Sequence, residues 1–281
     1  MHIAGSRWMA VAAAVFLLAV SANQSPVLCQ DQAAQVDPAL TEEGMRQFLL
    51  KAKVIGSKQS DTGVTRPFRL TLTDGRLTHY ASFQSIDDRK NSETMSDGKV
   101  EINFRDSYHY NIAAYEIAKL VGLGHMMPLT VERKWEGKTG SLSWWLKSKM
   151  NEKERMDKGI KTPDPEAWNR QMYRKRVFAN LVGDRDPNLT NVLIGENWEI
   201  YMIDFSRAFR ILDDIEKTDL VRCDRQLLER LRTLTAAGIA KATGHHLNKL
   251  EVDAVLKRRD RIVDYFQQLI AQKGENEVLY E

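Results

Sequence analysis

The alternation of hydrophobic and polar positions predicts several strands in the first half of the chain. Residues 68–87 alternate on both sides of Asp74-Gly75, and this glycine tolerates the positive φ of a tight turn. The segment therefore predicts a β-hairpin. Residues 126–146 predict two further strands around a turn at Gly137–Gly140.

Helical periodicity dominates the segments that flank and follow these strands. Thr41 precedes two glutamates, which is typical of a helix N-cap. Residues 107–124 carry apolar side chains at helical spacing, and Gly124 is the expected end of that helix. Residues 166–182 predict another helix, and the last third of the chain predicts helices over residues 224–241, 247–256 and 259–273.

Two polar segments, residues 87–99 and 147–165, have the composition of loops. Residues 191–205 predict a short hairpin, with apolar strands around a turn at Gly195-Glu196-Asn197. This order favours an α+β fold with two lobes, a small mixed α/β N-lobe and a mostly helical C-lobe. The expected boundaries are a signal peptide (1–22), a flexible lead-in (23–40), the N-lobe (41–146), an inter-lobe loop (147–165) and the C-lobe (166–281).

The N-terminus has the pattern of a secretory signal. Arg7 precedes an apolar run from Trp8 to Val20, and small residues follow it. Cleavage after Ala22, or a few residues later, would export the mature chain to the periplasm or the cell exterior. The alternative is an uncleaved N-terminal anchor, although the apolar run is short for a membrane span.

Composition narrows the choice of partners. The 41 basic and 38 acidic residues give a net charge of +3, too balanced to favour a nucleic acid. No apolar span of about 20 residues follows residue 30, so the mature chain is predicted to lack a membrane-spanning helix. The two cysteines, Cys29 and Cys223, make no disulfide framework, and Cys223 is expected to fill the core.

Chemically active side chains gather in residues 183–205. Asp186 and Asn191 precede the first strand of the predicted hairpin, and Asp204 ends the second. Asn191 and Asp204 can therefore lie side by side at the hairpin base. Carboxylate and amide oxygens suit Mg²⁺, which takes few protein ligands and completes its shell with phosphate oxygens. Asp186 can accept the proton of an incoming hydroxyl group, as phosphoryl transfer requires.

The spacing matches the kinase pattern His-Arg-Asp-x-x-x-x-Asn followed by Asp-Phe-Gly. Here the first motif runs from Asp184 through Arg185 and Asp186 to Asn191, and the second is Asp204-Phe205-Ser206. The Arg-Asp pair, the Asp-to-Asn interval and the Asp-Phe pair are kept. The histidine is replaced by aspartate and the last glycine by serine.

Two longer segments, "NIAAYEIAKLVGLGHMMPLTVER" (111–133) and "DRDPNLTNVLIGENWEIYMIDFSRAFR" (184–210), give the pattern a specific resemblance. The chain resembles the atypical kinases: the phosphatidylinositol 3-/4-kinase-like group, the HipA-like kinases and the Golgi casein kinases of the secretory pathway. The resemblance covers about residues 45–240. It implies a two-lobed protein-kinase-like fold that binds ATP with Mg²⁺ or Mn²⁺ between the lobes.

The resemblance also implies roles for individual residues. Asp186 would be the catalytic base or the carboxylate that orients the acceptor, and Arg185 would tether its loop. Asn191 and Asp204 would bind the metal. Asn188 would bind phosphate or hold the loop in shape.

The chain departs from the kinase pattern at the nucleotide-binding ion pair. Gln84 stands where the strand lysine is expected, and Asn111 where a related family has the helix glutamate. Glu116 follows five residues later, which turns its side chain away from that face of the helix. Besides Gln84 and Glu116, the nucleotide could use a cation from another place: Lys53, Arg69 or Lys90.

Several interpretations stay open at this stage. The chain could be an active phosphotransferase with an unknown protein, lipid or small-molecule acceptor, a pseudokinase or other nucleotide- or protein-binding module, or an enzyme that transfers AMP. A purely structural alternative is that Asp186, Asn188 and Asn191 form only a polar turn before the hairpin. The sequence does not define the oligomeric state.

Two pairs of neighbouring rings carry weaker expectations. Trp144 and Trp145 are adjacent on a strand, so one is expected in the core and the other at the rim of a site. His245 and His246 have no metal-binding partner at the right spacing, so they are predicted to be surface residues rather than zinc ligands.

Overall fold

The computed structural model describes residues 41–60, 66–94, 98, 100–184 and 188–281, with the side chains of 101–103 left out. All of these residues belong to one compact unit, residues 34–281. The predicted signal peptide and lead-in, and the candidate residues Arg185 and Asp186, lie outside the described residues. Within the described part of the chain, no helix combines the length and the apolar composition that crossing a bilayer requires.

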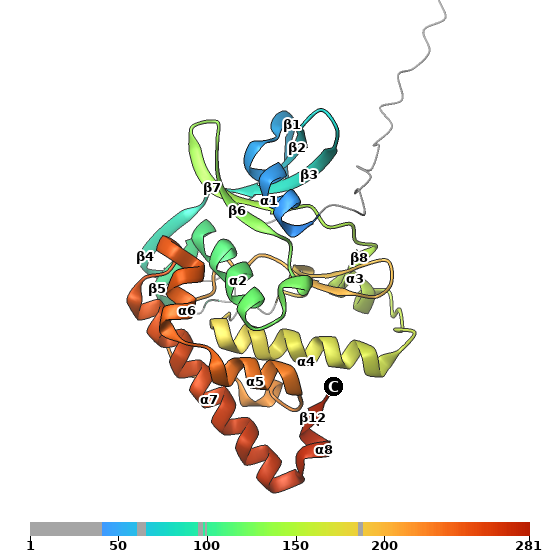
Figure 1. Ribbon diagram of the computed structural model, residues 1–281, viewed down its shortest axis with the longest axis vertical. Coiled ribbons are helices and arrows are strands. Elements are labelled where there is room, and N and C mark those ends of the chain that lie inside the picture. Colours follow the sequence, from blue (N-terminus) through green and yellow to red (C-terminus); the bar gives the residue numbers. More distant parts are fainter. Residues whose placement is uncertain (1–40, 61–65, 95–97, 99, 185–187) are drawn as a thin grey trace, which may run out of the picture. The chain divides into compact units, whose positions relative to one another are not determined.

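The N-lobe is built on a five-stranded antiparallel sheet (Figure 1). Its strands are β1 (Lys53–Gln59), β2 (Phe68–Thr73), β3 (Thr78–Gln84), β6 (Thr130–Trp135) and β7 (Lys138–Trp144), in the order β1-β2-β3-β7-β6. The predicted hairpin at Asp74-Gly75 is confirmed: Asp74 Oδ1 accepts from the backbone N–H groups of Arg76 and Leu77, and Gly75 has φ 90°. The predicted strands of residues 126–146 are confirmed as β6 and β7.

Helices α1 (Glu42–Lys51) and α2 (Tyr108–Leu120) pack on β6 and β7. Thr41 is the predicted N-cap of α1, and its hydroxyl accepts from the N–H of Gly44. Helix α2 ends at Leu120, before the expected Gly124, because the chain turns at Gly122 with φ 81°. Its alanine-rich face is completely buried, which lets the helix lie close to its neighbours.

Residues 87–99 were expected to form a loop, and this prediction was wrong for most of the segment. Strand β4 (Asp87–Thr94) pairs antiparallel with β5 (Val100–Ser107) in a two-stranded ribbon. Nearly every β4 residue is exposed, so the strand carries no apolar alternation by which its sequence could reveal it. The ribbon is held by backbone pairing instead.

The inter-lobe segment also contains more regular structure than its composition suggested. Strand β8 (Met150–Asn151) pairs with β9 (Val192–Ile194), and β9 pairs with β10 (Ile200–Met202). Helix α3 (Glu152–Asp157) follows β8, with Asn151 and Glu154 forming a capping box. These elements pack against β9 and against the turn at Leu189–Asn191 that precedes it.

The C-lobe is helical, with α4 (Pro165–Val182), α5 (Arg225–Thr233), α6 (Ala236–Thr243), α7 (Lys249–Lys273) and α8 (Glu275–Val278) (Figure 1). A short parallel pair, β11 (Cys223–Asp224) and β12 (Leu279–Tyr280), brings the C-terminus back to the start of α5. Cys223 is buried, as expected.

Two predicted helix boundaries in this lobe were wrong. Residues 224–241 form two helices, because the chain leaves the helical conformation at Leu234 and Thr235 caps a new helix. The two helices expected over residues 247–256 and 259–273 are the single helix α7, which begins at Lys249 and is capped by Asn248. The charged sequence around residue 258 looks like an interruption, but Arg258 is completely buried inside the helix packing.

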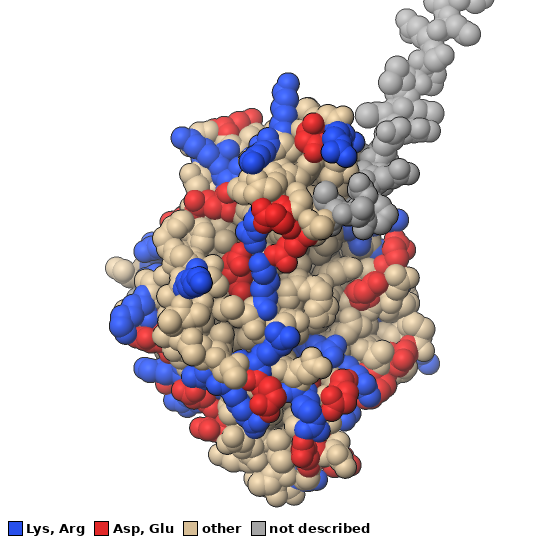
Figure 2. Space-filling view, in the orientation of Figure 1, with Lys and Arg blue, Asp and Glu red and all other residues tan. Residues whose placement is uncertain are grey.

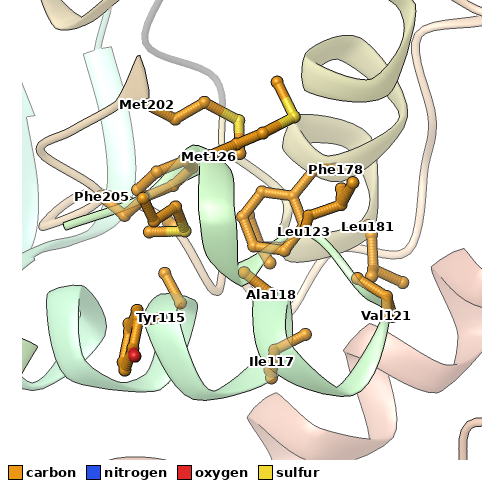
Figure 3. Close-up of a cluster of buried hydrophobic side chains, with 14 of the residues drawn as sticks. Tyr115, Ile117, Ala118, Val121, Leu123, Met126, Phe178, Leu181, Met202 and Phe205 are labelled. Atoms are coloured by element: carbon orange, nitrogen blue, oxygen red, sulfur yellow. The ribbon is translucent and has the colours of Figure 1, made fainter. Parts of the chain in front are cut away.

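One hydrophobic core connects α2 to the C-lobe (Figure 3). Tyr115, Ile117, Ala118, Val121, Leu123 and Met126 come from α2 and the segment after it, and they lie beside Phe178, Leu181, Met202 and Phe205. Phe178 of α4 meets the ring of Phe205 edge to face at 5.5 Å. The residue after Asp204 is therefore anchored in the core, which fixes where Asp204 itself can lie.

Candidate nucleotide and metal site

The hairpin β9–β10 brings Asn191 and Asp204 together. Strand pairing aligns Val192 with Met202, and at the open end the N–H of Ile203 donates to the carbonyl of Asn191 at 3.0 Å. Asp204 is the next residue, and Asn191 and Asp204 both line one cavity.

Asp204 has an unusual backbone conformation. Its φ is 59°, in the left-handed region that aspartate tolerates better than most side chains do. Such conformations persist where the surroundings enforce them, and they are common at functional sites. Here the buried ring of Phe205 and the pairing of Ile203 fix the residues on both sides.

A cavity of about 260 Å³ lies beside this motif, between the N-lobe sheet and the hairpin. Asn191 and Asp204 form part of its wall, and Gln84 and Asn111 form another part. Apolar surface dominates the remainder, including Met127, Leu193 and Met202. A mostly apolar cavity with a few convergent polar groups is typical of a small-molecule site.

The sheet contributes a face of small hydroxyl side chains to the cavity. Ser82 pairs with Ser143, and Ser143 with Thr130, so these three residues form one row across β3, β7 and β6. Gln84 pairs with Ser141 in the next row. A side chain at Gly140 would collide with the backbone carbonyl of Gln84. The glycine therefore lets the β7 backbone approach Gln84 closely.

Gln84 and Asn111 are hydrogen-bonded to each other. The Asn111 amide donates to Gln84 Oε1, and Asn111 Oδ1 accepts from the N–H of Phe205 at 2.7 Å. Asn111 thus connects β3 to the backbone directly after Asp204. A neutral amide pair thus stands where the resemblance led us to expect the lysine–glutamate ion pair of kinases. The sequence did not reveal that the two amides bind each other.

The other proposed nucleotide-binding residues lie elsewhere. Glu116 is bound to Arg46 at 2.9 Å and lies within 3.6 Å of Lys119, and it does not line the cavity. Lys53 is exposed at the start of β1, and Lys90 is paired with Glu93 on β4. The structure therefore brings none of these three residues to Asn191 and Asp204.

Arg69 lies beside the cavity. Its guanidinium stacks over the rings of Tyr80 at 4.7 Å and Trp145 at 5.7 Å. It lines a neighbouring hollow, and that hollow shares Pro67, Ser82 and Trp145 with the cavity. Of the three basic residues that the sequence suggested for nucleotide binding, Arg69 is thus the one that lies next to the cavity.

Of the two adjacent tryptophans, one lies in the core and the other at the rim of the cavity, as predicted. Trp144 is buried, whereas Trp145 is 40% exposed, and both line the cavity. His79 stacks on Trp144 at 3.8 Å, and burial lowers the pKa of His79 to about 4. The imidazole is therefore neutral at pH 7, and its Nε2–H donates to the carbonyl of Trp145 at 3.1 Å. This contact fixes the backbone at the rim.

Asn188 has a structural role in the described contacts. Its Oδ1 accepts from the N–H and the hydroxyl of Thr190, at 3.0 and 2.7 Å, and caps a short 3₁₀ turn over Leu189–Asn191. This contact corresponds to the loop-shaping alternative for Asn188.

Comparison with solved structures supports the fold, whereas comparison of the sequence finds no related protein. No protein-family model matches the chain, and no curated protein matches it. Among solved structures, a hydra Fam20 structure with sugar has a TM-score of 0.64 at 15% identity, covering 88% of this chain and 94% of that one. A Golgi casein kinase has a TM-score of 0.61 at 14% identity, covering 85% and 78%. The same kinase with Mn and ADP bound gives 0.59 at 12% identity, covering 85% and 78%.

These similarities define the class of fold. The chain has an atypical kinase-like fold, with an antiparallel sheet in the N-lobe and helices in the C-lobe, as the sequence predicted. At such low identities they establish architecture alone, so activity has to be argued from the residues of the site.

Proposed function

We propose that this protein is a metal-dependent phosphotransferase that binds ATP with Mg²⁺ or Mn²⁺ in the cavity between its lobes. The observation that carries the proposal is that Asn191 and Asp204 reach the same cavity from the base of one rigid hairpin. Their oxygens are the ligand types that Mg²⁺ and Mn²⁺ accept alongside phosphate. We also propose that residues 41–146 form the N-lobe and residues 166–281 the C-lobe, and that residues 147–165 join the two lobes.

The remaining roles follow from position in the motif. Asp186 would orient the acceptor hydroxyl and accept its proton, with Arg185 tethering the loop. The apolar wall, with Trp145 at the rim, suits an adenine ring. Arg69 would supply positive charge toward the phosphates from the adjoining hollow. The acceptor is a hydroxyl-bearing protein, lipid or small molecule.

A second candidate function is nucleotide binding without transfer. It is favoured by the neutral Gln84–Asn111 pair, because an amide stabilises the charge of a triphosphate less than a lysine does. Incubating the protein with ATP labelled at the γ or the α phosphate separates the possibilities. Transfer of the γ label supports the phosphotransferase, transfer of the α label indicates AMP transfer, and binding without either supports the second candidate.

The Gln84–Asn111 pair is expected to act as one unit in nucleotide binding. Each of Gln84→Ala and Asn111→Ala should weaken ATP affinity by about tenfold, because each leaves the other amide without its partner. The double variant should be little worse than either single one. Calorimetric titration with ATP and Mn²⁺ measures this coupling. Fully additive losses would contradict the paired role.

Export is a separate part of the proposal and depends on residues 1–22. A fusion of residues 1–40 to a reporter should appear outside the cytoplasm. Replacing Val15 and Leu17 with aspartate should retain it inside, because charges interrupt the apolar run that a signal peptide needs. Equal export of both fusions would contradict the assignment.

A further inference from the structure

Three histidines and a glutamate meet at one edge of the N-lobe sheet. His109 is in the first turn of α2, Glu132 is on β6, and His245 and His246 form the 3₁₀ turn Gly244–His246 before α7. One ligand atom from each residue can be chosen so that all four lie within 4.8 Å of one another. His245 is exposed at the surface as predicted, but His246 is not. The prediction that the two histidines lack metal-binding partners was wrong, because the fold brings partners from 113 and 137 residues away.

The separations approach those of a tetrahedral site. His109 Nδ1 and His246 Nδ1 are 2.8 Å apart, His245 Nε2 and Glu132 Oε2 are 3.2 Å apart, and His246 Nδ1 and Glu132 Oε2 are 3.9 Å apart. Four ligands around zinc, with bonds of about 2.0–2.1 Å, stand about 3.3 Å from one another. Small side-chain rotations would thus bring the four atoms onto one ion.

The cluster is held in place from several elements. The Tyr108 hydroxyl donates to Glu132 Oε2 at 3.3 Å, which orients the carboxylate. The Tyr110 hydroxyl donates at 2.7 Å to Glu251, which also forms the capping box of α7 just after the two histidines. Only 11% of the His246 side chain is exposed, against 67% of His245. A bound ion would therefore be seated in the protein and reachable from one side.

Two histidines of the cluster are half-buried. Burial lowers the pKa of His246 to about 4, and it also lowers the pKa of His109. Neutral imidazole is the form that binds a metal. Without a metal, the two Nδ1 atoms share one hydrogen bond.

We propose that His109, Glu132, His245 and His246 bind one Zn²⁺ ion. Histidine nitrogen and carboxylate oxygen are both ligands that zinc accepts, and four is the number of ligands that structural zinc takes. The ion would connect the edge strand β6, the start of α2 and the turn before α7, which belong to different parts of the chain. It would therefore act as a crosslink between the sheet and the helical region.

This site differs from the proposed nucleotide metal site. Its ligands are mainly nitrogen, which favours zinc over Mg²⁺, whereas Asn191 and Asp204 offer only oxygen. None of its four residues lines the cavity. It nevertheless adjoins the cavity, because Glu132 pairs with Ser141 and Ser141 pairs with Gln84 in one row on the same sheet face.

A crosslink here would stabilise the position of α2. Asn111 lies on this helix two residues after His109, and it holds both Gln84 and the backbone N–H of Phe205. Zinc would keep the N-terminal turn of α2 against β6 and so keep Asn111 in register with the cavity. The zinc site itself does not depend on the proposed transfer activity.

The test is the zinc affinity of the tag-free full chain, measured by competition with a chromophoric chelator at pH 7.5. Wild type should bind one Zn²⁺ per chain. His245→Gln should bind at least about tenfold more weakly, because it removes one ligand of four. His245 is largely exposed, so this variant should keep the wild-type circular dichroism spectrum. His125→Gln is the matched control, since His125 is exposed and lies outside the cluster.

Two further measurements test whether these residues bind the ion and whether its coordination is tetrahedral. Zinc should raise the melting temperature of wild type and of His125→Gln, but not that of the double variant His109→Asn/His246→Asn. Co²⁺ in place of Zn²⁺ should give the intense visible absorption of a tetrahedral site. The proposal is overturned if wild type binds less than one equivalent at micromolar zinc, if His245→Gln binds as tightly as wild type, or if the Co²⁺ spectrum is octahedral.

Discussion

Replacing Asp204 with asparagine is expected to lower metal-dependent ATP turnover about a thousandfold. The change removes one carboxylate charge from the proposed cation site, and a metal ion contributes several kcal/mol of transition-state stabilisation. A loss of about 4 kcal/mol corresponds to this factor. Asparagine is chosen because Asp204 has φ 59°, and asparagine tolerates that conformation where alanine would be strained.

The matched control for this experiment is Asp157→Asn. Asp157 is an exposed residue of α3 whose described ion pair is with Lys153, so its loss should leave turnover within twofold of wild type. Turnover is measured as release or transfer of the γ phosphate with Mn²⁺ present. Equal turnover of Asp204→Asn and wild type would show that Asp204 does not bind the catalytic metal.

Replacing Arg258 with methionine is expected to lower the free energy of unfolding by about 3–5 kcal/mol, because several buried carbonyls lose their hydrogen-bond donor. Arg258 is completely buried, and its guanidinium donates to the carbonyls of Leu181, Arg210 and Leu212. Methionine fills much of the same volume but donates to none of them, so three backbone carbonyls lose a charged donor. Gly183, with φ 66°, has no room for a side chain beside this guanidinium.

Denaturant unfolding measures this loss, with Arg261→Met as the control. Arg261 is on the same helix but is exposed, and its ion pair with Asp213 should contribute no more than about 1 kcal/mol. Leu181 lies in the last turn of α4, and Leu212 follows Asp204 in sequence. Arg258 therefore holds the C-lobe around the candidate motif. Equal destabilisation by the two substitutions would contradict this role.

Local patterns predicted the elements that have one buried face. The hairpin at Asp74-Gly75, the helix over 166–182 and the hairpin of β9 and β10 all follow from alternation, helical period or spacing. Each of these signals lies within about 20 residues of sequence, and burial on one side enforces it.

Contacts between distant segments could not be predicted in the same way. Strand β4 is exposed along nearly its whole length and depends on β5 for its structure. Helix α7 continues through a run of charges because Arg258 binds carbonyls 46–77 residues away. The Gln84–Asn111 bond and the histidine cluster likewise join residues 27 to 137 positions apart, and only the tertiary fold makes them neighbours.

The surface adds little to the choice of partner. On the face drawn in Figure 2, basic and acidic side chains are interspersed rather than gathered into a field of one sign. This agrees with the near balance of 41 basic and 38 acidic residues. Under the proposed function, a charged nucleotide would be recognised by the cavity and the proposed cation, because this face offers no field of one sign.

The most direct test of the central claim is the affinity for ATP with and without Mn²⁺, in wild type and in Asp204→Asn. If Asn191 and Asp204 hold the cation that binds the triphosphate, Mn²⁺ should tighten ATP binding to wild type by at least about tenfold. The same ion should change binding to Asp204→Asn by less than twofold. ATP binding that Mn²⁺ strengthens equally in both proteins, or no binding to wild type at millimolar ATP, would contradict the account.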